Sequence, residues 1–182
     1  LNMYENYPFW FTLLTSLGFS VKLSAASSKK VYELGIETIP SESACYPAKL
    51  VHGHIMDLIN KGVNTIFYPC VPYEKREFAD ANNHYNCPMV TSYPEVIRNN
   101  MDELKEKHIK FIEPFFSLDD EKELAKRIVI EFKDYDVSLA EARKAVEAAA
   151  KERDSYKQDI RNKGEEVLKY LKENNKRGIV LC

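Results

Sequence analysis

The hydrophobic positions along the chain predict helices that alternate with short strands. In residues 46–61, apolar side chains recur every three or four positions, which places them on one side of a helix. A further helix is predicted for residues 94–107. Residues 63–68 form a mostly apolar run, typical of a strand buried in a parallel sheet, and residues 110–114 are a second predicted strand. Such alternation is typical of βαβ units.

The first 35 residues predict one helix, one strand and one short helix. Pro8 suits the first turn of a helix, where its missing N–H is harmless, and Gly18 suits the end of that helix. Residues 19–24 alternate between apolar and polar side chains, which predicts a strand. A short helix, capped by Ser27 or Ser28, is then expected to end near Gly35.

Two capping patterns mark the later helices. Residues 117–120 resemble a capping box and precede a helix with apolar residues at four-residue steps. Residues 138–141 form a proper capping box and open a long helix, from about Ser138 to Asn175. At 1.5 Å per residue, such a helix is roughly 57 Å long. It should therefore protrude from the domain or break near Gly164. Its predicted inward stripe consists of Ala142, Val146, Ala149, Tyr156, Ile160, Val167 and Leu171.

These elements predict an α/β fold: a Rossmann-like, doubly wound, mainly parallel sheet followed by a long C-terminal helix. We expect residues 1–135 to form a cysteine-bearing α/β domain, and residues 136–182 to form the long helix and the start of a strand. Residues 1–4 also resemble the tail of a strand. We therefore expect the chain to be one domain of a larger polypeptide, with a further domain downstream.

Composition places the chain among ordinary globular proteins. Of its 182 residues, 45% are hydrophobic and 30% are charged, and the net charge is −2. This balance argues against a nucleic-acid partner and against a basic membrane-binding face. No apolar run approaches the ~20 residues of a membrane-spanning helix, and no secretory signal is evident, so we expect a cytoplasmic location. The glycine-rich phosphate-binding motifs of nucleotide sites are absent.

Three of the four cysteines share an unusual sequence context. Cys45, Cys70 and Cys87 each have a proline within two residues, although the chain has only 8 prolines. Cys45 falls at a predicted helix start, where the helix dipole favours a thiolate. Cys70 follows a predicted strand, where α/β folds place their sites, and Cys87 ends an irregular loop. These three thiols could converge on one point, whereas Cys182 is left outside the predicted site.

The cysteines alone leave several interpretations open. Buried cysteines are often no more than small apolar residues. A structural disulfide is less expected, because nothing marks the chain as secreted. Zinc is possible if His84 joins the cysteines, since two residues separate it from Cys87. An iron–sulfur cluster suits three thiolates and would leave one iron with an open ligand position.

Three segments of the chain resemble the CoA-substrate-specific enzyme activase family. They are residues 2–10 (NMYENYPFW), residues 39–54 around Cys45, and residues 66–70 (IFYPC). More narrowly, they are similar to the domain that lies downstream of the family's ATPase modules. That domain is in turn similar to the 2-hydroxyacyl-CoA dehydratase subunits, which have a Pro-Phe-Trp motif near their first strand. The resemblance covers residues 1–115 well and the long helix loosely.

The resemblance implies a ligand set and a set of partners. In dehydratase subunits, three cysteines hold a [4Fe–4S] cluster, and the matching residues here are Cys45, Cys70 and Cys87. The implied partners are the ATPase activator modules and a dehydratase-like domain, together with an acyl-CoA. ATP hydrolysis is not assigned to this chain, because the ATPase motifs are absent. Whether the chain is itself an enzyme stays open.

Three functions therefore compete. The leading one is an iron–sulfur redox module that relays low-potential electrons and loses its cluster in air. The second is a domain without a cluster that binds an acyl-CoA or docks a subunit. The third is a zinc-stabilised structural domain. The apolar stripe of the long helix also predicts that the chain forms homo-oligomers.

Overall fold

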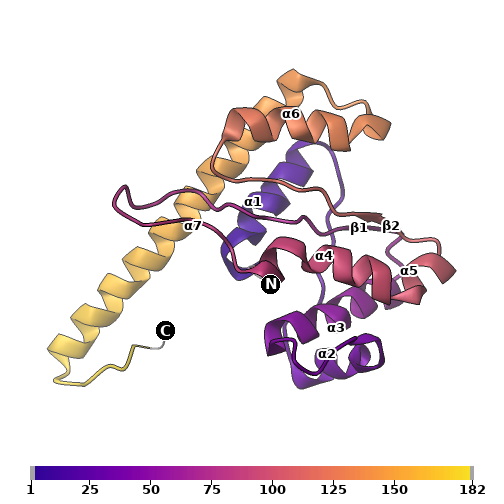
Figure 1. The fold of residues 1–182 in the computed structure, drawn as a ribbon. Coiled ribbons are helices and arrows are strands. Elements are labelled where there is room, and N and C mark those ends of the chain that lie inside the picture. Colours follow the sequence, from indigo (N-terminus) through magenta and orange to yellow (C-terminus); the bar gives the residue numbers. More distant parts are fainter. Residues whose placement is uncertain (1–2, 181–182) are drawn as a thin grey trace.

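The computed structural model describes residues 3–180, except for the side chain of Tyr4. Helices dominate it, and two short strands lie in the middle of the chain (Figure 1). In chain order the elements are α1 (Met3–Ser16), α2 (Lys29–Leu34), the 3₁₀ helix η1 (Ile36–Thr38), α3 (Tyr46–Asn60), β1 (Thr65–Phe67), α4 (Pro88–Asn100), α5 (Asp102–Glu106), β2 (Lys110–Ile112), α6 (Glu121–Glu131), the 3₁₀ helix η2 (Lys133–Tyr135) and α7 (Leu139–Glu173).

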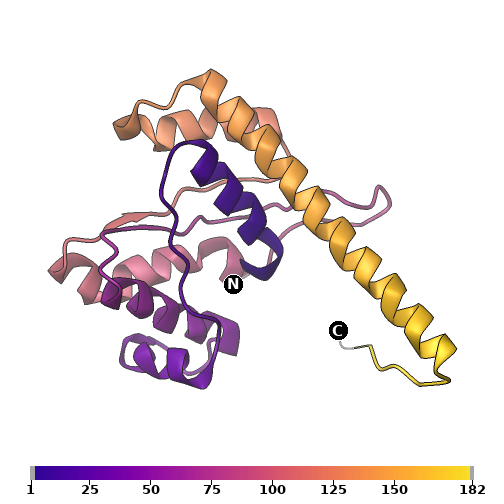
Figure 2. The ribbon, with the colours of Figure 1, turned by 180° about the vertical axis from the view of Figure 1, so that it is seen from behind.

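The two strands form a small parallel sheet between two layers of helices. Ile66 of β1 pairs with Phe111 of β2, and an isolated bridge between Cys70 and Phe115 extends the pairing beyond the strands. Helices α1, α6 and α7 lie on one side of the sheet, and α2, α3 and α4 lie on the other (Figures 1 and 2). Parallel strands are normally covered on both faces in this way, because each face of the sheet is apolar.

The layer of α1, α6 and α7 is held by apolar packing. Trp10 of α1 stands edge-on to Phe67 of β1, with 5.5 Å between ring centroids, and packs on Phe116 at 6.0 Å. Alanines of α7 let α1 approach this helix closely, and Ala142 and Ala149 are fully buried. Aromatic pairs of this kind add about 0.5–1.5 kcal/mol beyond their buried area.

The opposite layer joins α3, α4 and α5 over the other face of β1. Ile66 lies here with Ile55 of α3, Ile97 of α4 and Leu104 of α5, and all four are buried. Helix α2 packs closely on α3 because Gly35 and Gly53 have no side chain at the contact. A Cβ on Gly53 would overlap the carbonyl oxygen of Val31.

The structure confirms parallel strands, flanking helices and a long last helix, but not a Rossmann-like doubly wound sheet. Among residues 3–180 the sheet has two strands. The strand predicted for residues 19–24 is wrong, because this segment is irregular and no strand pairs with it. A segment with alternating apolar and polar residues forms a strand only when a neighbouring strand pairs with its backbone N–H and C=O groups. The described residues supply no such neighbour here.

Three helix boundaries in the structure also differ from the predicted ones. Helix α1 starts at Met3 and holds Pro8 inside it, and α4 starts at Pro88 rather than Pro94. A proline directly after Cys87 suits the first helical position, which explains this earlier start. The predicted helix over 94–107 is split at Met101, which separates α4 from α5. The N-cap of α6 is Asp120, within the capping segment predicted at 117–120.

Helix α7 keeps its predicted capping box and runs unbroken past Gly164. Its 35 residues span about 52 Å, and its second half protrudes from the domain (Figures 1 and 2). The predicted inward stripe is correct for Ala142, Val146 and Ala149, which are buried. It is wrong for Ile160 and Val167, which are exposed because the helix has left the body of the domain there.

Two further predictions concern the end of the chain and membranes. Residues 178–180 are not part of a strand, and Cys182 lies outside the described residues. No helix within residues 3–180 has the length and apolar character needed to cross a membrane.

Candidate cysteine site

Two of the three predicted cysteines cap neighbouring helices. Cys45 is the N-cap of α3 and Cys87 is the N-cap of α4. Their backbone conformations are nearly the same, with φ/ψ of −63°/153° and −64°/156°, and a proline occupies the first or second position of each helix. Both thiols are exposed. Neither side chain caps its helix by a hydrogen bond, so the first N–H groups of both helices are left to other acceptors.

The starts of α3 and α4 lie at the same end of the domain. His52 Nε2 and Tyr93 Oη form a hydrogen bond of 3.0 Å between the two helices. His52 follows Cys45 by seven residues and Tyr93 follows Cys87 by six, so the contact lies nearly equally far from each helix start. In Figure 1 both helices run towards the side from which β1 and β2 start, so they are parallel. The two helices lie side by side in both views (Figures 1 and 2). Their two positive dipole ends therefore point in the same direction.

A hairpin-like loop connects Cys70 with Cys87. The backbone N–H of Asn86 donates to the Pro72 carbonyl at 2.9 Å, and its side-chain amide donates to the Val71 carbonyl at 2.9 Å. Tyr73 and Tyr85 form an antiparallel bridge further along the loop. The irregular stretch between these cysteines thus closes on itself, and Cys70 and Cys87 lie at its base.

The third cysteine is in a different environment from the other two. Cys70 is fully buried just beyond β1, and burial is the main reason that the pKa of its thiol rises to about 11. The Glu95 and Glu113 carboxylates add to this rise, whereas the nearby Glu95 backbone and Arg98 oppose it. Glu95 lies eight residues beyond Cys87, or about 12 Å along α4. The Cys70 sulfur therefore faces the middle of α4 rather than its start.

The Tyr68 hydroxyl lies within electrostatic range of both Cys45 and Cys70. Its buried hydroxyl has no hydrogen-bond partner among the described residues. Burial raises the pKa of Tyr68 most, and the nearby Tyr93, Cys70 and Cys45 raise it further. The Cys45 thiol likewise contributes to the raised pKa of Tyr93. Both tyrosines therefore stay protonated, and their hydroxyls lie within electrostatic range of Cys45.

An acidic residue beside Cys70 titrates near neutral pH. The Glu113 side chain is 9% exposed and pairs with Arg98, and its second oxygen has no partner among the described residues. Burial raises the pKa of Glu113 to about 7, although Arg98 lowers it and Glu95 raises it a little more. Glu113 can therefore exchange a proton at neutral pH next to a protonated thiol.

His84 lies beside an acidic and an aromatic side chain. Its Nε2 lies 3.5 Å from an Asp119 carboxylate oxygen, and its ring stacks on Tyr85. Within residues 3–180, no three His, Cys, Asp or Glu side chains are grouped tightly enough to hold a metal ion. His52 and His54 face different ways, as their two-residue spacing predicts: His52 contacts Tyr93, and His54 contacts Ser24.

The residues present fit an iron–sulfur cluster by their chemistry. Three free thiols are the ligands that such clusters use, and two of them lie at helix starts that favour negative charge. Cys45 and Cys87 are exposed, whereas Cys70 is buried near Glu95 and Glu113, so the three thiols differ in accessibility.

Sequence reasoning missed the polar residues behind the cysteines. Tyr68, Tyr93 and Glu113 occupy positions that look like ordinary core or surface residues in the sequence. Tyr68 belongs to the IFYPC segment and is two residues from Cys70, so its position next to the site was the available signal. Nothing in the sequence around Tyr93 or Glu113 indicates their partners, because these come from other elements.

Comparison with protein families gives one match. A family model described as "CoA enzyme activase uncharacterised domain" matches residues 1–182. A search of curated proteins and a search of solved structures each gave no match to the chain.

Proposed function

The chain belongs to the family of the CoA enzyme activase uncharacterised domain, and from that premise we propose that it is a redox module. In this proposal Cys45, Cys70 and Cys87 hold an iron–sulfur cluster of the [4Fe–4S] or a related type. The module relays low-potential electrons between the ATPase modules of a larger activase and a domain or partner similar to 2-hydroxyacyl-CoA dehydratase. When bound, such a cluster supplies one-electron chemistry at a potential set by its surroundings.

The placement of Cys45 and Cys87 is the observation that supports this proposal most. They cap two parallel, neighbouring helices that start at the same end of the domain. A cluster held by thiolates carries negative charge, and helix N-termini stabilise nearby anions. The free N–H groups in the first turns of α3 and α4 would donate to cluster or thiolate sulfur, which tunes the potential.

Cys70 and its neighbours would control the loading of the site. Metal ligation requires a thiolate, so the Cys70 thiol, with its pKa of about 11, must release a proton. Glu113 has a pKa of about 7 and lies beside Cys70, so it is placed to accept that proton at neutral pH.

Anaerobic reconstitution with ferrous iron and sulfide tests the proposal. We expect broad visible absorption and an electron paramagnetic resonance signal that develops on reduction. Cys45→Ser and Cys87→Ser should each lose most of the bound iron, whereas Cys182→Ser should keep it and serves as the matched control. Equal iron in all four proteins would contradict the proposed ligands, and stoichiometric zinc without sulfide would favour the zinc-stabilised domain instead.

Air sensitivity gives a second test of the same site. Two of the thiols are exposed, so an aerobic preparation should contain no cluster. An intact cluster in a preparation handled in air would contradict this open arrangement.

A further inference from the structure

One face of β1 and of the residues after it carries a row of three side chains. Tyr68 N–H donates to the Ile112 carbonyl at 2.9 Å. Two residues further on, Cys70 N–H donates to the Pro114 carbonyl at the same distance, so the chain is still extended there. Alternate residues of an extended chain point to the same face. Ile66, Tyr68 and Cys70 therefore share the face that α3 and α4 cover, and the Tyr68 ring packs against the apolar cluster of that face.

The Tyr68 hydroxyl, in the middle of this row, has no hydrogen-bond partner among the described residues although it is buried. Nearly all buried polar side-chain atoms in proteins are hydrogen-bonded. A buried donor without a partner has lost its bonds to water and gained none in return. The chain therefore retains this hydroxyl at a cost in stability, which points to a role for its free O–H group.

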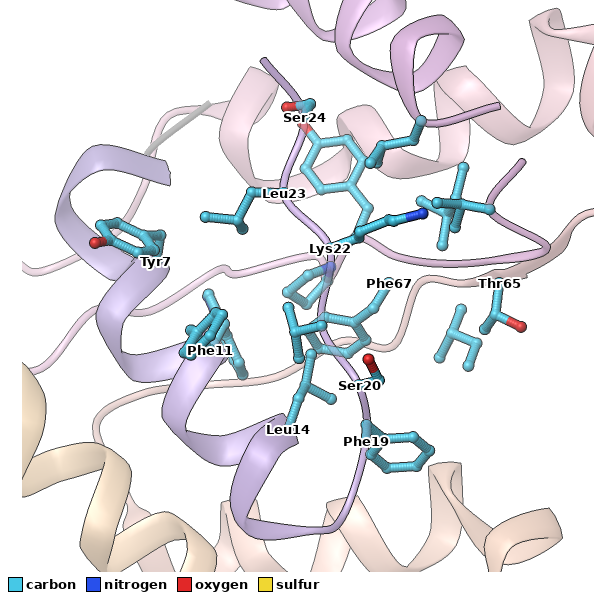
Figure 3. A pocket seen from close by; sticks show the side chains of 18 of the residues that line it. Tyr7, Phe11, Leu14, Phe19, Ser20, Lys22, Leu23, Ser24, Thr65 and Phe67 are labelled. Atoms are coloured by element: carbon cyan, nitrogen blue, oxygen red, sulfur yellow. The ribbon is translucent and has the colours of Figure 1, made fainter. Parts of the chain in front are cut away.

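The groove beside Tyr68 does not supply the missing acceptor. It encloses about 560 Å³ between α1, β1 and residues 19–24, and the Tyr68 side chain forms part of its wall. Figure 3 shows the Ser20, Ser24 and Thr65 hydroxyls around the same space. None of them bonds to Tyr68, and Ser24 bonds to a histidine of α3 instead. Because the Tyr68 hydroxyl is buried, solvent in the groove does not bond to it either.

The neighbouring Tyr93 hydroxyl differs from that of Tyr68, because its hydrogen is already bonded. The Thr38 hydroxyl donates to a backbone carbonyl at 2.9 Å, so it accepts from His52 Nδ1, which lies 2.8 Å away. Burial keeps His52 neutral, so its Nε2 is an acceptor, and the Tyr93 hydroxyl donates to it at 3.0 Å. Both tyrosine hydroxyls lie within electrostatic range of Cys45. Of the two, Tyr68 is the one whose hydrogen no described residue accepts.

The position of Tyr68 fits a sulfur acceptor that is present only after loading. Its hydroxyl lies within electrostatic range of Cys45 and Cys70. Neutral thiol sulfur is a weak acceptor, so the hydroxyl gains little from it in the unloaded chain. Thiolate and sulfide sulfur carry negative charge, and hydrogen bonds to charged acceptors are about twice as strong as those between neutral groups. The free O–H group therefore suits an anionic sulfur site.

We propose that the Tyr68 hydroxyl donates a hydrogen bond to sulfur of the iron–sulfur group held by Cys45, Cys70 and Cys87, and thereby makes that group easier to reduce. The inference rests on the proposed redox module and assigns one of its tuning residues. A donor stabilises the reduced form more than the oxidised form, because reduction adds negative charge to the sulfur. In the unloaded chain, the same hydroxyl only lowers stability. These two effects have opposite signs, which distinguishes the role from ordinary packing.

Two measurements on Tyr68→Phe test this inference. In the unloaded chain the substitution removes an unpaired buried hydroxyl, so the urea midpoint should rise, whereas Tyr93→Phe removes a bonded hydroxyl and should lower it. In chain reconstituted anaerobically with ferrous iron and sulfide, Tyr68→Phe should keep the iron content of the parent. Its redox titration should give a potential about 59 mV lower, which is a tenfold weaker preference for the reduced form. Tyr170→Phe, at an exposed position of α7, is the matched control and should change neither quantity.

The outcomes separate this inference from the proposed function. If loaded Tyr68→Phe has the potential of the parent, the inference is overturned, although the redox module itself stands. A lower urea midpoint for unloaded Tyr68→Phe would also overturn it, since the hydroxyl would then have a partner before loading. A parent chain that takes up no iron would contradict the proposed function, and the role of Tyr68 would be refuted with it.

Discussion

The two faces of the small sheet are built in different ways. On the face of α1, α6 and α7, the buried contacts are mainly aromatic rings and alanines, such as Trp10 on Phe67, and Arg153 of α7 is the buried charged residue among them. On the face of α3 and α4, buried apolar residues share the space with titratable groups, among them His52, Tyr93 and Cys70. The first face therefore stabilises the fold, and the second positions the candidate site at some cost in stability.

The largest expected effect lies on the packing face. Phe9 is fully buried against Trp10 and Arg153, so Phe9→Ala should lower the free energy of unfolding by about 3–5 kcal/mol. Phe11→Ala, at an exposed position one residue beyond Trp10, should change it by only about 0.5 kcal/mol. Urea titration of both variants measures the difference. Similar losses for the two variants would contradict the assignment of the core to this face.

The glycine contact between α2 and α3 gives the next largest effect. A Cβ at Gly53 would overlap the Val31 carbonyl, so Gly53→Ala should cost about 2–3 kcal/mol by separating the two helices. Gly164→Ala is the matched control, since no atom lies near that position. It should stabilise α7 by up to about 1 kcal/mol. Thermal unfolding of both variants should give shifts of opposite sign, and a stabilised Gly53→Ala would refute the close approach.

The hydrogen bond between α3 and α4 gives a smaller effect on stability. Tyr93→Phe leaves His52 Nε2 without its partner and should cost about 1–2 kcal/mol. If the bond sets the register of the two cysteine-capped helices, the variant should also bind less iron on reconstitution. Tyr170→Phe, which removes an exposed hydroxyl, should leave both quantities unchanged. An unaltered iron content in Tyr93→Phe would show that Cys45 and Cys87 are aligned without this bond.

Two buried groups should give opposite pH dependences on the site face. Burial lowers the pKa of His52 from 6.5 to about 4, so its contribution to stability is lost as the pH falls from 6.5 towards 4. Burial raises the pKa of Glu113 from 4.5 to about 7, so its contribution is lost as the pH rises through that window. Denaturation of Glu113→Gln between pH 4 and 8 should keep the loss of stability towards low pH, to which His52 and His54 contribute, and lack the loss towards pH 7. A profile unchanged from the parent chain would exclude the Glu113 contribution.

The protruding half of α7 should matter least for stability. Ile160 and Val167 are about half exposed, so replacing both with aspartate should change the free energy of unfolding by about 0.5 kcal/mol or less. The same change should abolish self-association of the parent chain, measured by sedimentation over a range of concentrations. A parent chain that stays monomeric at every concentration would contradict an association through this stripe.

Local signals in the sequence predicted much of the fold. Ser138 and Glu141 form the predicted capping box, and Ser28 caps α2 as expected. These features depend on residues close together in the chain. The sheet could not be predicted in the same way, because residues 19–24 and 63–68 show strand patterns whose outcome depends on neighbours elsewhere. The split of α4 from α5 at Met101 has no strong local signal either.

In the candidate site, too, local features could be predicted from the sequence and features that depend on distant residues could not. The sequence placed Cys45 at a helix start, and Cys45 is the N-cap of α3. Cys87 was predicted only to end a loop, and the helix that begins directly after it was missed. The raised pKa of Cys70 could not be predicted, since it depends on burial and on Glu95 and Glu113 in other elements. The pKa of Glu113 likewise results from burial and from Arg98, which is distant in the sequence.

Labelling of the cysteines before and after reconstitution tests the central claim most directly. Chain loaded anaerobically with iron and sulfide is treated with iodoacetamide, and the modified residues are identified by mass spectrometry. Because Cys45 and Cys87 are exposed and Cys70 is buried, we expect rapid labelling of the first two in the unloaded chain. Loading should protect Cys45, Cys70 and Cys87 together while Cys182 still reacts. A loaded chain in which Cys45 and Cys87 react as fast as before would contradict the proposed redox module.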